Sequence, residues 1–451
     1  LNGGECLVDN VVVQQGGNRV TNGTFNTNIG GWLAQGHHKR SAWNPNGVSG
    51  GCLYVRGDND GDTGVNRIET DLSSVLTINQ DVVITAQVRW LAGHPGILFR
   101  IRGNYMEASG RMEVPANLGT PGMVNSRAKA NTGPAIWDVV QSPILPAASE
   151  GVLVSARISD TDTVASVTLR YRVDPALTTN VLNMTDNGTG GDAVAGDRIY
   201  SAMLPGQSAG TLIAYHIRAV DGRAVAATNF YPLDAPVREA LVRFGEESLV
   251  GNFGTYRLWM TQTNMNLWTQ REPLDNDSLP CTFVYGAHRV IHNAGAYYRG
   301  SPFIRATYNT PVGNLCAYHV DLPDEDRFLG TDKLNLDSLE PARENTSQRE
   351  KICFWMAGRI GVPYSHQRFV HVYVNGARRG NIYGDSLHVS ADYVECWFPE
   401  EASGEIYKVD DWFEFPVDGS FTDFVLYDAT LQEFTTTGGA LKKERYRWIW
   451  E

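Results

Sequence analysis

The chain has 451 residues, of which 42% are hydrophobic and 20% are charged, and its formal net charge is −12 at pH 7. This length exceeds one ordinary hydrophobic core, so we expect three domains. The acidic balance argues against nucleic acid as a partner, because binding to phosphate backbones needs clustered Lys and Arg. No apolar run reaches the length of a membrane span, and none is predicted.

Residues 1–146 are predicted to form an N-terminal β-sandwich. Short segments such as 81–90 and 96–102 alternate apolar and polar residues, and Gly and Asn turns separate them. That pattern is typical of antiparallel strands with one buried face.

Three stretches of this domain, at 22–25, 31–32 and 50–54, resemble the opening strands of carbohydrate-binding jelly rolls. The resemblance implies a jelly-roll domain with glycans as partners. Sugar rings would stack on exposed tryptophans, whereas burial of the same rings in the core is the alternative. The tryptophans concerned are Trp32, Trp43 and Trp90.

A short acidic loop in the same domain places three carboxylates at alternate positions, namely Asp58, Asp60 and Asp62. Carboxylate oxygens are the ligands that Ca²⁺ prefers, so these residues are candidates for a calcium site. A solvated acidic turn is the alternative. An EF-hand is not predicted, because Thr63 stands where that loop requires Gly.

Residues 147–240 are predicted to form an immunoglobulin-like or fibronectin-III-like sandwich that acts as a spacer. Period-two alternation over 152–158, 165–173 and 211–220 indicates its strands. The loop 184–197 looks like the M-x-D-x-G…G-D-x-x-A-G-D loop of bacterial extracellular Ig-like modules. Three of its aspartates are candidate Ca²⁺ ligands, although carboxylates in such turns also bond their own backbone. They are Asp186, Asp192 and Asp197.

Residues 241–451 show mixed helix and strand patterns, which predict an α+β domain. Strands are predicted at 256–260, 282–285 and 288–292, the last two joined by a tight turn. A capping box followed by apolar residues at helical spacing predicts one amphipathic helix over 347–361.

A β-hairpin is predicted at 369–383. Residues 369–374 alternate like a half-buried strand, and Asn375-Gly376 suits a two-residue turn with positive φ angles. A second strand should therefore return through 379–383. The apolar run 394–398 is interpreted as a further strand.

Several short motifs of this region together resemble the spore-coat protein H (CotH) family of atypical protein kinases. They are the Asn375-Gly376-x-x-x-Gly380 hairpin with Tyr383 beyond it, Asp392-Tyr393-Val394, Ile406-Tyr407-Lys408 followed by acids, Tyr298-Arg299-Gly300-Ser301, and the segment 347–363. The resemblance implies an atypical-kinase-like α+β fold and Mg-ATP as cofactor.

The resemblance also implies a site in which cations hold phosphates and carboxylates hold Mg²⁺. Lys408 falls on the family's lysine, and Asp410 or Asp411 follows it as a candidate Mg²⁺ ligand. Arg299 and Arg305 are the nearest upstream cations.

The chain departs from the family after the hairpin, where the usual Glu and Asp are absent. The two positions hold Leu387 and Ser390 in one alignment and Ser386 and Val389 in the other. Asp385 or Asp392 would have to substitute, but Mg²⁺ tolerates little displacement of its ligands. The candidate catalytic acids are thus Asp392, Asp410 and Asp411. We therefore expect a protein-kinase fold, or pseudokinase, that is weakly active or inactive in this form.

The six cysteines contain no Cys-x-x-Cys pair, so no zinc finger or ribbon is predicted. Cys6 and Cys52 predict a disulfide, because we expect a secreted or cell-surface bacterial protein. Cys281 with Cys316 is the second choice. The two remaining cysteines are as well explained as buried thiols.

Three classes of function remain open. The chain could be an Mg-ATP kinase that acts on surface proteins, a carbohydrate-binding adhesin without catalysis, or a structural component of an extracellular or envelope assembly that forms homo-oligomers. The aromatic residues near the end of the chain lack a predicted partner, so we expect the last domain to continue beyond residue 451.

Overall fold

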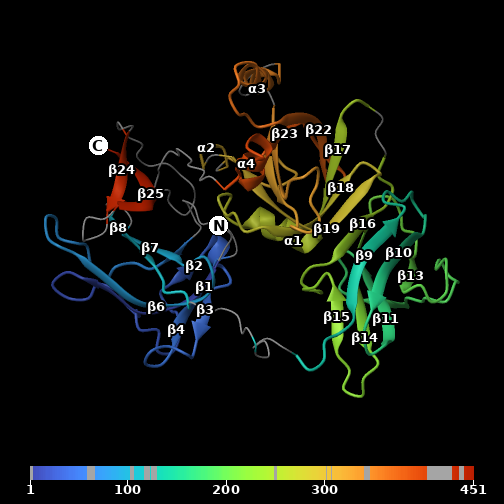
Figure 1. The fold of residues 1–451 in the computed structure, drawn as a ribbon, viewed down its shortest axis with the longest axis horizontal. Helices are drawn as coiled ribbons and strands as arrows, with labels where there is room; N and C mark the ends of the chain where they lie inside the picture. The colour runs from blue at the N-terminus through green and yellow to red at the C-terminus, as the bar shows by residue number, and fades with distance from the viewer. Residues whose placement is uncertain are drawn as a thin grey trace.

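The computed structural model describes residues 4–57, 67–101, 106–115, 122, 129–247, 251–300, 302–305, 307–339, 346–403, 429–435 and 441–450. Its secondary structure is mainly β, as predicted. Figure 1 shows three groups of strands, coloured blue to cyan, green, and yellow to orange from the N-terminus onwards. Among the described residues, no helix is long and apolar enough to cross a membrane.

The first group is built on a four-stranded antiparallel sheet in the order β3-β4-β1-β6. Two strand pairs, β2 with β5 and β7 with β8, accompany it. The bounds are β1 Gly4–Gln14, β2 Leu33–Ala34, η1 Gly36–His38, β3 Ala42–Asn44, β4 Cys52–Gly57, β5 Ile68–Glu69, β6 Val83–Gly93, β7 Gly96–Ile101 and β8 Met106–Arg111. Val8, Phe25 and Leu53 are buried in its core. The two facing four-stranded sheets of a jelly roll are not assembled among the described residues, so the jelly roll stays a prediction.

The second group is a sandwich of two sheets, β13-β10-β9 and β12-β11-β14-β15, with β16 also pairing with β14. The bounds are β9 Ala135–Ser142, β10 Val152–Ser159, β11 Val164–Val173, β12 Asn180–Asn183, β13 Ile199–Leu204, β14 Leu212–Asp221, β15 Thr228–Tyr231 and β16 Ala240–Arg243. Every second residue of β10 is buried, as its alternation predicts. Side chains from both sheets form one core. The immunoglobulin-like assignment itself stays a prediction.

Strand β9 belongs to this sandwich although it precedes the predicted domain boundary at residue 146. It pairs with β10 in antiparallel register. Ile136 and Val139 pack against the second core. The second sandwich therefore begins before the Pro-rich segment that suggested a linker.

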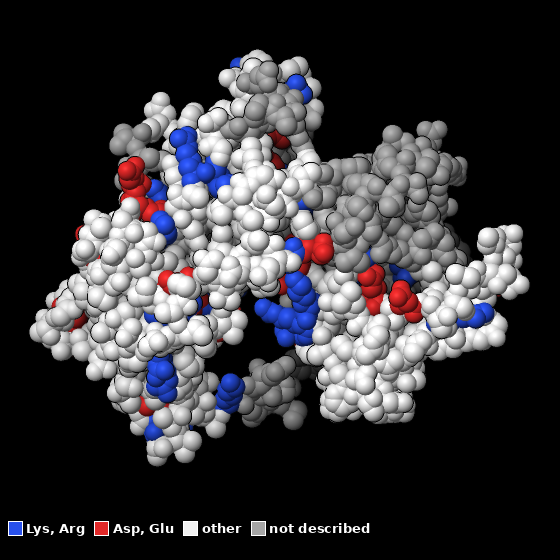
Figure 2. Space-filling model, turned by 180° about the vertical axis from the view of Figure 1, so that it is seen from behind, with Lys and Arg blue, Asp and Glu red and all other residues white. Residues whose placement is uncertain are grey.

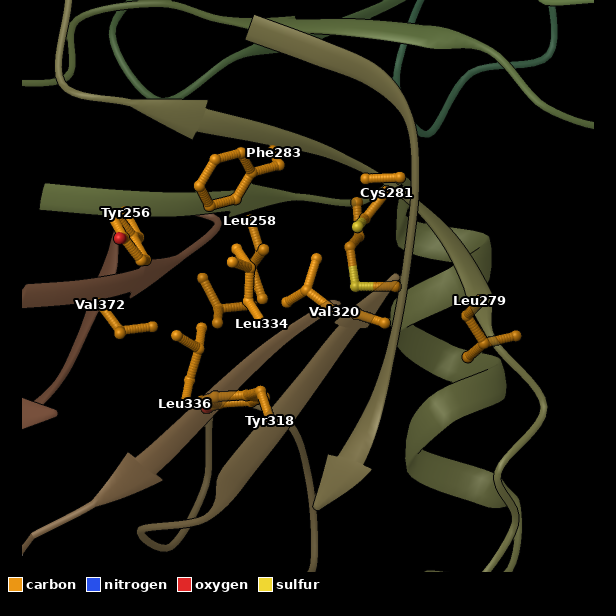
Figure 3. Packing of buried hydrophobic residues seen from close by; sticks show 14 of the residues in the cluster. Tyr256, Leu258, Leu279, Cys281, Phe283, Tyr318, Val320, Leu334, Leu336 and Val372 are labelled. Atoms are coloured by element: carbon orange, nitrogen blue, oxygen red, sulfur yellow. The ribbon is translucent and has the colours of Figure 1, made fainter. Parts of the chain in front are cut away.

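The third group is a closed seven-stranded barrel in the order β17-β18-β19-β20-β21-β23-β22. The parallel pair of β17 with β22 closes it, and the other neighbouring pairs are antiparallel. The bounds are β17 Gly254–Trp259, β18 Leu279–Tyr285, β19 Arg289–Arg299, β20 Ala317–Asp321, β21 Lys333–Ser338, β22 Gln367–Val374 and β23 Ala377–Leu387. The interior is filled by side chains from facing strands (Figure 3), among them Tyr256, Leu258, Phe283, Tyr318, Val320, Leu334 and Leu336.

The predicted hairpin is confirmed in β22 and β23. Val374 pairs with Ala377, so the turn has two residues. Asn375 and Gly376 have φ angles of 45° and 81°, as the turn requires. The predicted pairing of β18 with β19 is confirmed, but Tyr285 pairs with Arg289, so the connection holds His288 as well as Gly286 and Ala287.

Four helices accompany the barrel among the described residues: α1 Gln262–Gln270, α2 Pro302–Arg305, α3 Arg349–Arg359 and α4 Ala391–Trp397. Helix α3 confirms the predicted amphipathic helix, but none of its residues is buried and it projects away from the barrel (Figure 1). Its capping box does not form, because the hydroxyl of Ser347 donates to the backbone oxygen of Leu339 instead.

The interpretation of residues 394–398 as a strand is wrong. Residues 391–397 form α4, whose first backbone bonds return to the oxygen of Ser390. The closed barrel leaves no free strand edge beside this segment, so a helix satisfies its backbone locally. Farther on, β24 (Ala429–Thr435) and β25 (Leu441–Trp450) form an antiparallel pair.

The predicted disulfide between Cys6 and Cys52 is wrong, because both thiols are free. Cys6 lies opposite Val55, so Cys52 is displaced by about 10 Å along β4. A disulfide needs Cα atoms within about 7 Å. Burial raises the pKa of Cys6 to about 11. Cys281 and Cys316 are also free, and Cys353 and Cys396 are exposed rather than buried.

The sandwich and the barrel share buried contacts. The Tyr215 hydroxyl lies 3.3 Å from Nε2 of His292 in β19. Trp259 and Val284 of the barrel pack into the core of the second sandwich. Lys39 of the first group forms an ion pair with Asp275 beside α1. These contacts join all three groups to one another around the barrel.

Candidate functional site

Polar side chains gather on the outer face of the barrel because β20 and β21 alternate. Tyr318 and Val320 of β20 fill the interior, so the intervening His319 faces outwards with Asp321. In β21, Leu334 and Leu336 are likewise buried inside, and the residues between and beyond them, Asn335 and Asp337, lie on the outer face. The pleat thus sets two rows of polar groups side by side.

These rows form a hydrogen-bonded chain around His319. Its Nδ1 is 2.9 Å from Oδ1 of Asn335, and its Nε2 is 3.1 Å from Oδ1 of Asp321. The Asn335 amide donates in turn to Nδ1 of His388 at 2.9 Å. Both nitrogens of His319 therefore lie within hydrogen-bonding distance of a side-chain oxygen.

The charges of this chain are set by burial and by neighbours. Burial opposes the charged form of Asp321, but hydrogen bonds from His319 and Ser278 outweigh it and lower the pKa of that carboxyl. Burial, together with the charge of His319, lowers the pKa of His388 to about 3. His388 is thus a neutral acceptor near pH 7.

A second polar group connects helix α3 to the barrel. The Gln367 amide donates to the carboxylate of Glu350 and, at 3.0 Å, to the hydroxyl of Ser386. Burial and the nearby charge of Asp337 raise the pKa of Glu350. Position 386 is one where the CotH pattern has an acid. In this chain it is a serine, and its hydroxyl accepts a hydrogen bond from the side chain of Gln367.

The two upstream arginines predicted to bind phosphate are engaged within the chain. Arg305 is 6% exposed, and its guanidinium donates to the backbone oxygens of Pro273 and Asp275 and to the side chain of Asn276. Arg299 forms an ion pair with Asp337. Arg305 thus supports the loop before β18, and Arg299 neutralises a carboxylate.

Asp392, predicted as a catalytic acid, lies at the other end of β21 from this pair. Its oxygens accept from Arg327 at 3.0 Å and from the backbone N–H of Asp332 at 3.3 Å. Burial raises the pKa of Asp332, and a hydrogen bond with Asp392 raises it further. Asp332 and Asp337 are five residues apart, or roughly 16 Å along a strand, so Asp392 and Arg299 are not brought together.

The remaining predicted residues of the nucleotide site, Lys408, Asp410 and Asp411, lie outside the described residues, as do Asp58, Asp60 and Asp62. The structure does bring together the other predicted calcium ligands. Carboxylate oxygens of Asp186, Asp192 and Asp197 all lie within 4.8 Å of one another.

A cleft of about 440 Å³ lies at the junction of the three groups. One cation from each group lines it, namely Arg40, Arg238 and Lys333, and acids including Asp321 and Asp324 line it too. On the face drawn in Figure 2, Lys and Arg lie in small separate groups rather than as one continuous basic surface. Whether nucleic acid is a partner stays a prediction from the net charge of −12.

Sequence reasoning missed the chain formed by His319, Asn335 and His388. The signal was the alternation of β20 and β21, which places every second residue on one face. The pairing of β21 with β23, which brings His388 near, joins distant parts of the chain and has no local signature.

These observations define a class of domain: a closed barrel with charged side chains on its outer face and an attached helix. The family model described as CotH kinase protein matches residues 316–447, from the start of β20 into β25. The C-terminal region thus contains a CotH-like domain. No curated protein matches the chain.

Proposed function

We propose that this chain is an extracellular or cell-surface protein whose β-sandwich modules carry a CotH-like domain with little or no phosphotransfer activity. The proposal rests on the two arginines that were predicted to bind phosphate, because both bind groups of the chain itself instead. Arg305 is held by backbone oxygens, and Arg299 is paired with Asp337.

The acidic side of the site supports the same proposal. The position that would supply a carboxylate in one alignment holds Ser386, whose hydroxyl is hydrogen-bonded to Gln367. Asp385, which could have substituted, is buried against the Tyr256 hydroxyl at 2.7 Å and paired with Arg368 at 2.9 Å. Burial raises the pKa of Asp385, which weakens it as a metal ligand.

Residual binding of Mg-ATP would rest on Lys408 with Asp410 or Asp411, as the CotH resemblance implies. A thermal-shift titration of the whole chain with Mg-ATP tests this role. We expect Mg-ATP to stabilise the chain slightly and Lys408→Ala to abolish this effect. Lys129→Ala, at an exposed position before β9, should leave it unchanged. Equal stabilisation of both variants would remove Lys408 from the proposal.

A calcium site in the 184–197 loop is a second candidate function, favoured by the convergence of its three carboxylates. Asp186 already accepts from the backbone N–H groups of Gly196 and Arg198, and Asp192 accepts from Gly188. These bonds hold the loop in shape and leave further lone pairs on each carboxylate, since an ionised carboxylate offers about four. Extracellular modules bind Ca²⁺ with dissociation constants of about 10⁻⁴–10⁻³ M, which fits the proposed location.

Removal of calcium tests that site without any mutation. At a Ca²⁺ concentration 100 times the dissociation constant, binding stabilises the native state by about 2.7 kcal/mol, so EDTA should lower the melting temperature of the second sandwich. Asp197→Asn should reduce the response to EDTA, and Asp234→Asn, at an exposed position outside the loop, should not. An unchanged melt and no calcium by elemental analysis would exclude the site.

A further inference from the structure

A small cavity lies where the start of β17 meets the turn between β18 and β19. Its volume is about 230 Å³, and residues 251–255, Arg257 and residues 285–288 line it. All of these precede residue 316, so the cavity lies outside the region that the CotH family model matches. No role assigned above involves it.

Arg257 provides the chemical character of the cavity. Its side chain is 2% exposed, Nε lies 2.7 Å from a carboxylate oxygen of Glu246, and Nη2 donates to the backbone oxygen of Glu247. The guanidinium also lies 5.6 Å from the ring centre of Tyr373. Its Nη1 is buried and has no hydrogen-bond acceptor among the described residues. A buried donor of this kind is costly to leave unpaired, which favours a ligand that accepts from it.

The charge around Arg257 is not balanced by its neighbours. Glu246 pairs with both Arg243, at 2.8 Å, and Arg257, and it also accepts from Nε1 of Trp259 at 3.2 Å. Within the described part of the chain, no other carboxylate forms an ion pair with either arginine. Two guanidinium groups on one carboxylate leave a surplus positive charge beside the cavity.

The backbone around the cavity allows a close approach. A Cβ on Gly254 would lie 3.0 Å from the ring of Tyr285, so glycine lets the turn pack against the strand. Gly286 has a φ of +53°, which the turn requires. At the mouth, Phe253 is 44% exposed and makes edge contacts with Phe369 and His371. The rim thus offers a flat apolar ring next to a buried cation.

We propose that this cavity binds a small oxyanion, a carboxylate or a phosphate monoester, attached to a flat apolar group that lies on Phe253. A planar guanidinium with a spare donor suits the paired oxygens of such an anion, and a negative ligand would neutralise the surplus charge. The inference goes beyond the proposed function and does not depend on it, because it involves none of the residues assigned to nucleotide.

Calorimetric titration of the whole chain with inorganic phosphate, phenyl phosphate and benzoate, at constant ionic strength, tests the proposal. We expect saturable binding, with one of the two ring-bearing anions at least tenfold tighter than inorganic phosphate, and the tighter one identifies the source of the oxyanion. Phe253→Ala should remove that preference. The absence of saturable binding for all three probes up to about 10 mM would overturn the proposal.

Ala287 provides a matched pair of variants, because it is exposed and lines the cavity. Ala287→Glu places a carboxylate at the mouth and should weaken binding at least tenfold, whereas Ala287→Gln should bind like the parent chain. Equal binding by the two would place the anion elsewhere and contradict the proposal. Lys408→Ala should leave binding intact, and a loss there would assign the anion to the nucleotide site instead.

Discussion

His292 shows how a single buried side chain connects two parts of the molecule. It is 3% exposed, its Nε2 lies 3.3 Å from the Tyr215 hydroxyl, and its Nδ1 has no partner among the described residues. Burial lowers the pKa of His292 to about 4. The ring is therefore neutral near pH 7 and resists protonation while the chain is folded.

The pKa of His292 predicts acid sensitivity. Its folded pKa of about 4 lies below the unfolded value near 6.5, so the unfolded chain binds the extra proton first as the pH falls. The contribution of His292 to stability should be constant above pH 6.5 and decline between pH 6.5 and 4, by up to about 1.4 kcal/mol per pH unit. Denaturant unfolding at several pH values measures this slope.

Two variants separate His292 from other titrating groups. His292→Gln keeps a polar group near Tyr215 and should make the decline below pH 6.5 shallower. His288→Gln, at an exposed histidine on the same hairpin, should leave the slope unchanged. If the two variants had the same slope, burial of His292 would not be the cause.

At the scale of elements, helix α3 has an unusual position. Ile352, Trp355, Met356 and Ile360 follow the predicted helical spacing, yet they are 50%, 59%, 55% and 76% exposed. The sequence pattern predicts the helix but not what its apolar face contacts. In its first turn, Glu350 and Lys351 meet Gln367, and farther along Phe354 stacks on Tyr364.

Mutation of this face should have little effect on the stability of the chain. Trp355→Ala should change the free energy of unfolding by less than about 0.5 kcal/mol, as is usual for exposed sites. Trp268→Ala in α1 is the comparison, because Trp268 is 1% exposed and its loss should cost about 3–5 kcal/mol. A large destabilisation by Trp355→Ala would show that α3 is buried in solution.

Elements with a local signal could be predicted from the sequence, and those that depend on distant partners could not. The Asn375-Gly376 hairpin follows from a dipeptide that accepts positive φ angles. Closure of the barrel depends on β17 pairing in parallel with β22, more than 100 residues away, and neither strand carries a sign of that partner. The same closure explains why residues 394–398 form a helix rather than another strand.

The candidate site divides in the same way. Asp186, Asp192 and Asp197 could be predicted as a group because one Gly-rich loop carries all three. Arg299 and Arg305 could be identified by motif, but their ion pair with Asp337 and hydrogen bond to Asn276 depend on tertiary packing. A motif specifies the type of residue, whereas the fold decides which partners neutralise the charge of that residue.

At the scale of the whole molecule, a group of strands around a four-stranded sheet and a sandwich of two sheets accompany a barrel whose C-terminal part is CotH-like. Phosphoryl transfer depends on positioning and on neutralising charge with metal ions and cations. Here the upstream arginines are engaged and the usual acids after the hairpin are absent. Loss of one such electrostatic group typically reduces the rate by about 10²–10³.

The most direct measurement is transfer of labelled phosphate from Mg-ATP to a Ser-containing protein acceptor by the 451-residue chain. We expect incorporation no higher than that of the Lys408→Ala variant or of a reaction with EDTA. Robust transfer that requires Mg²⁺ and is lost in Lys408→Ala would contradict it and establish an active kinase.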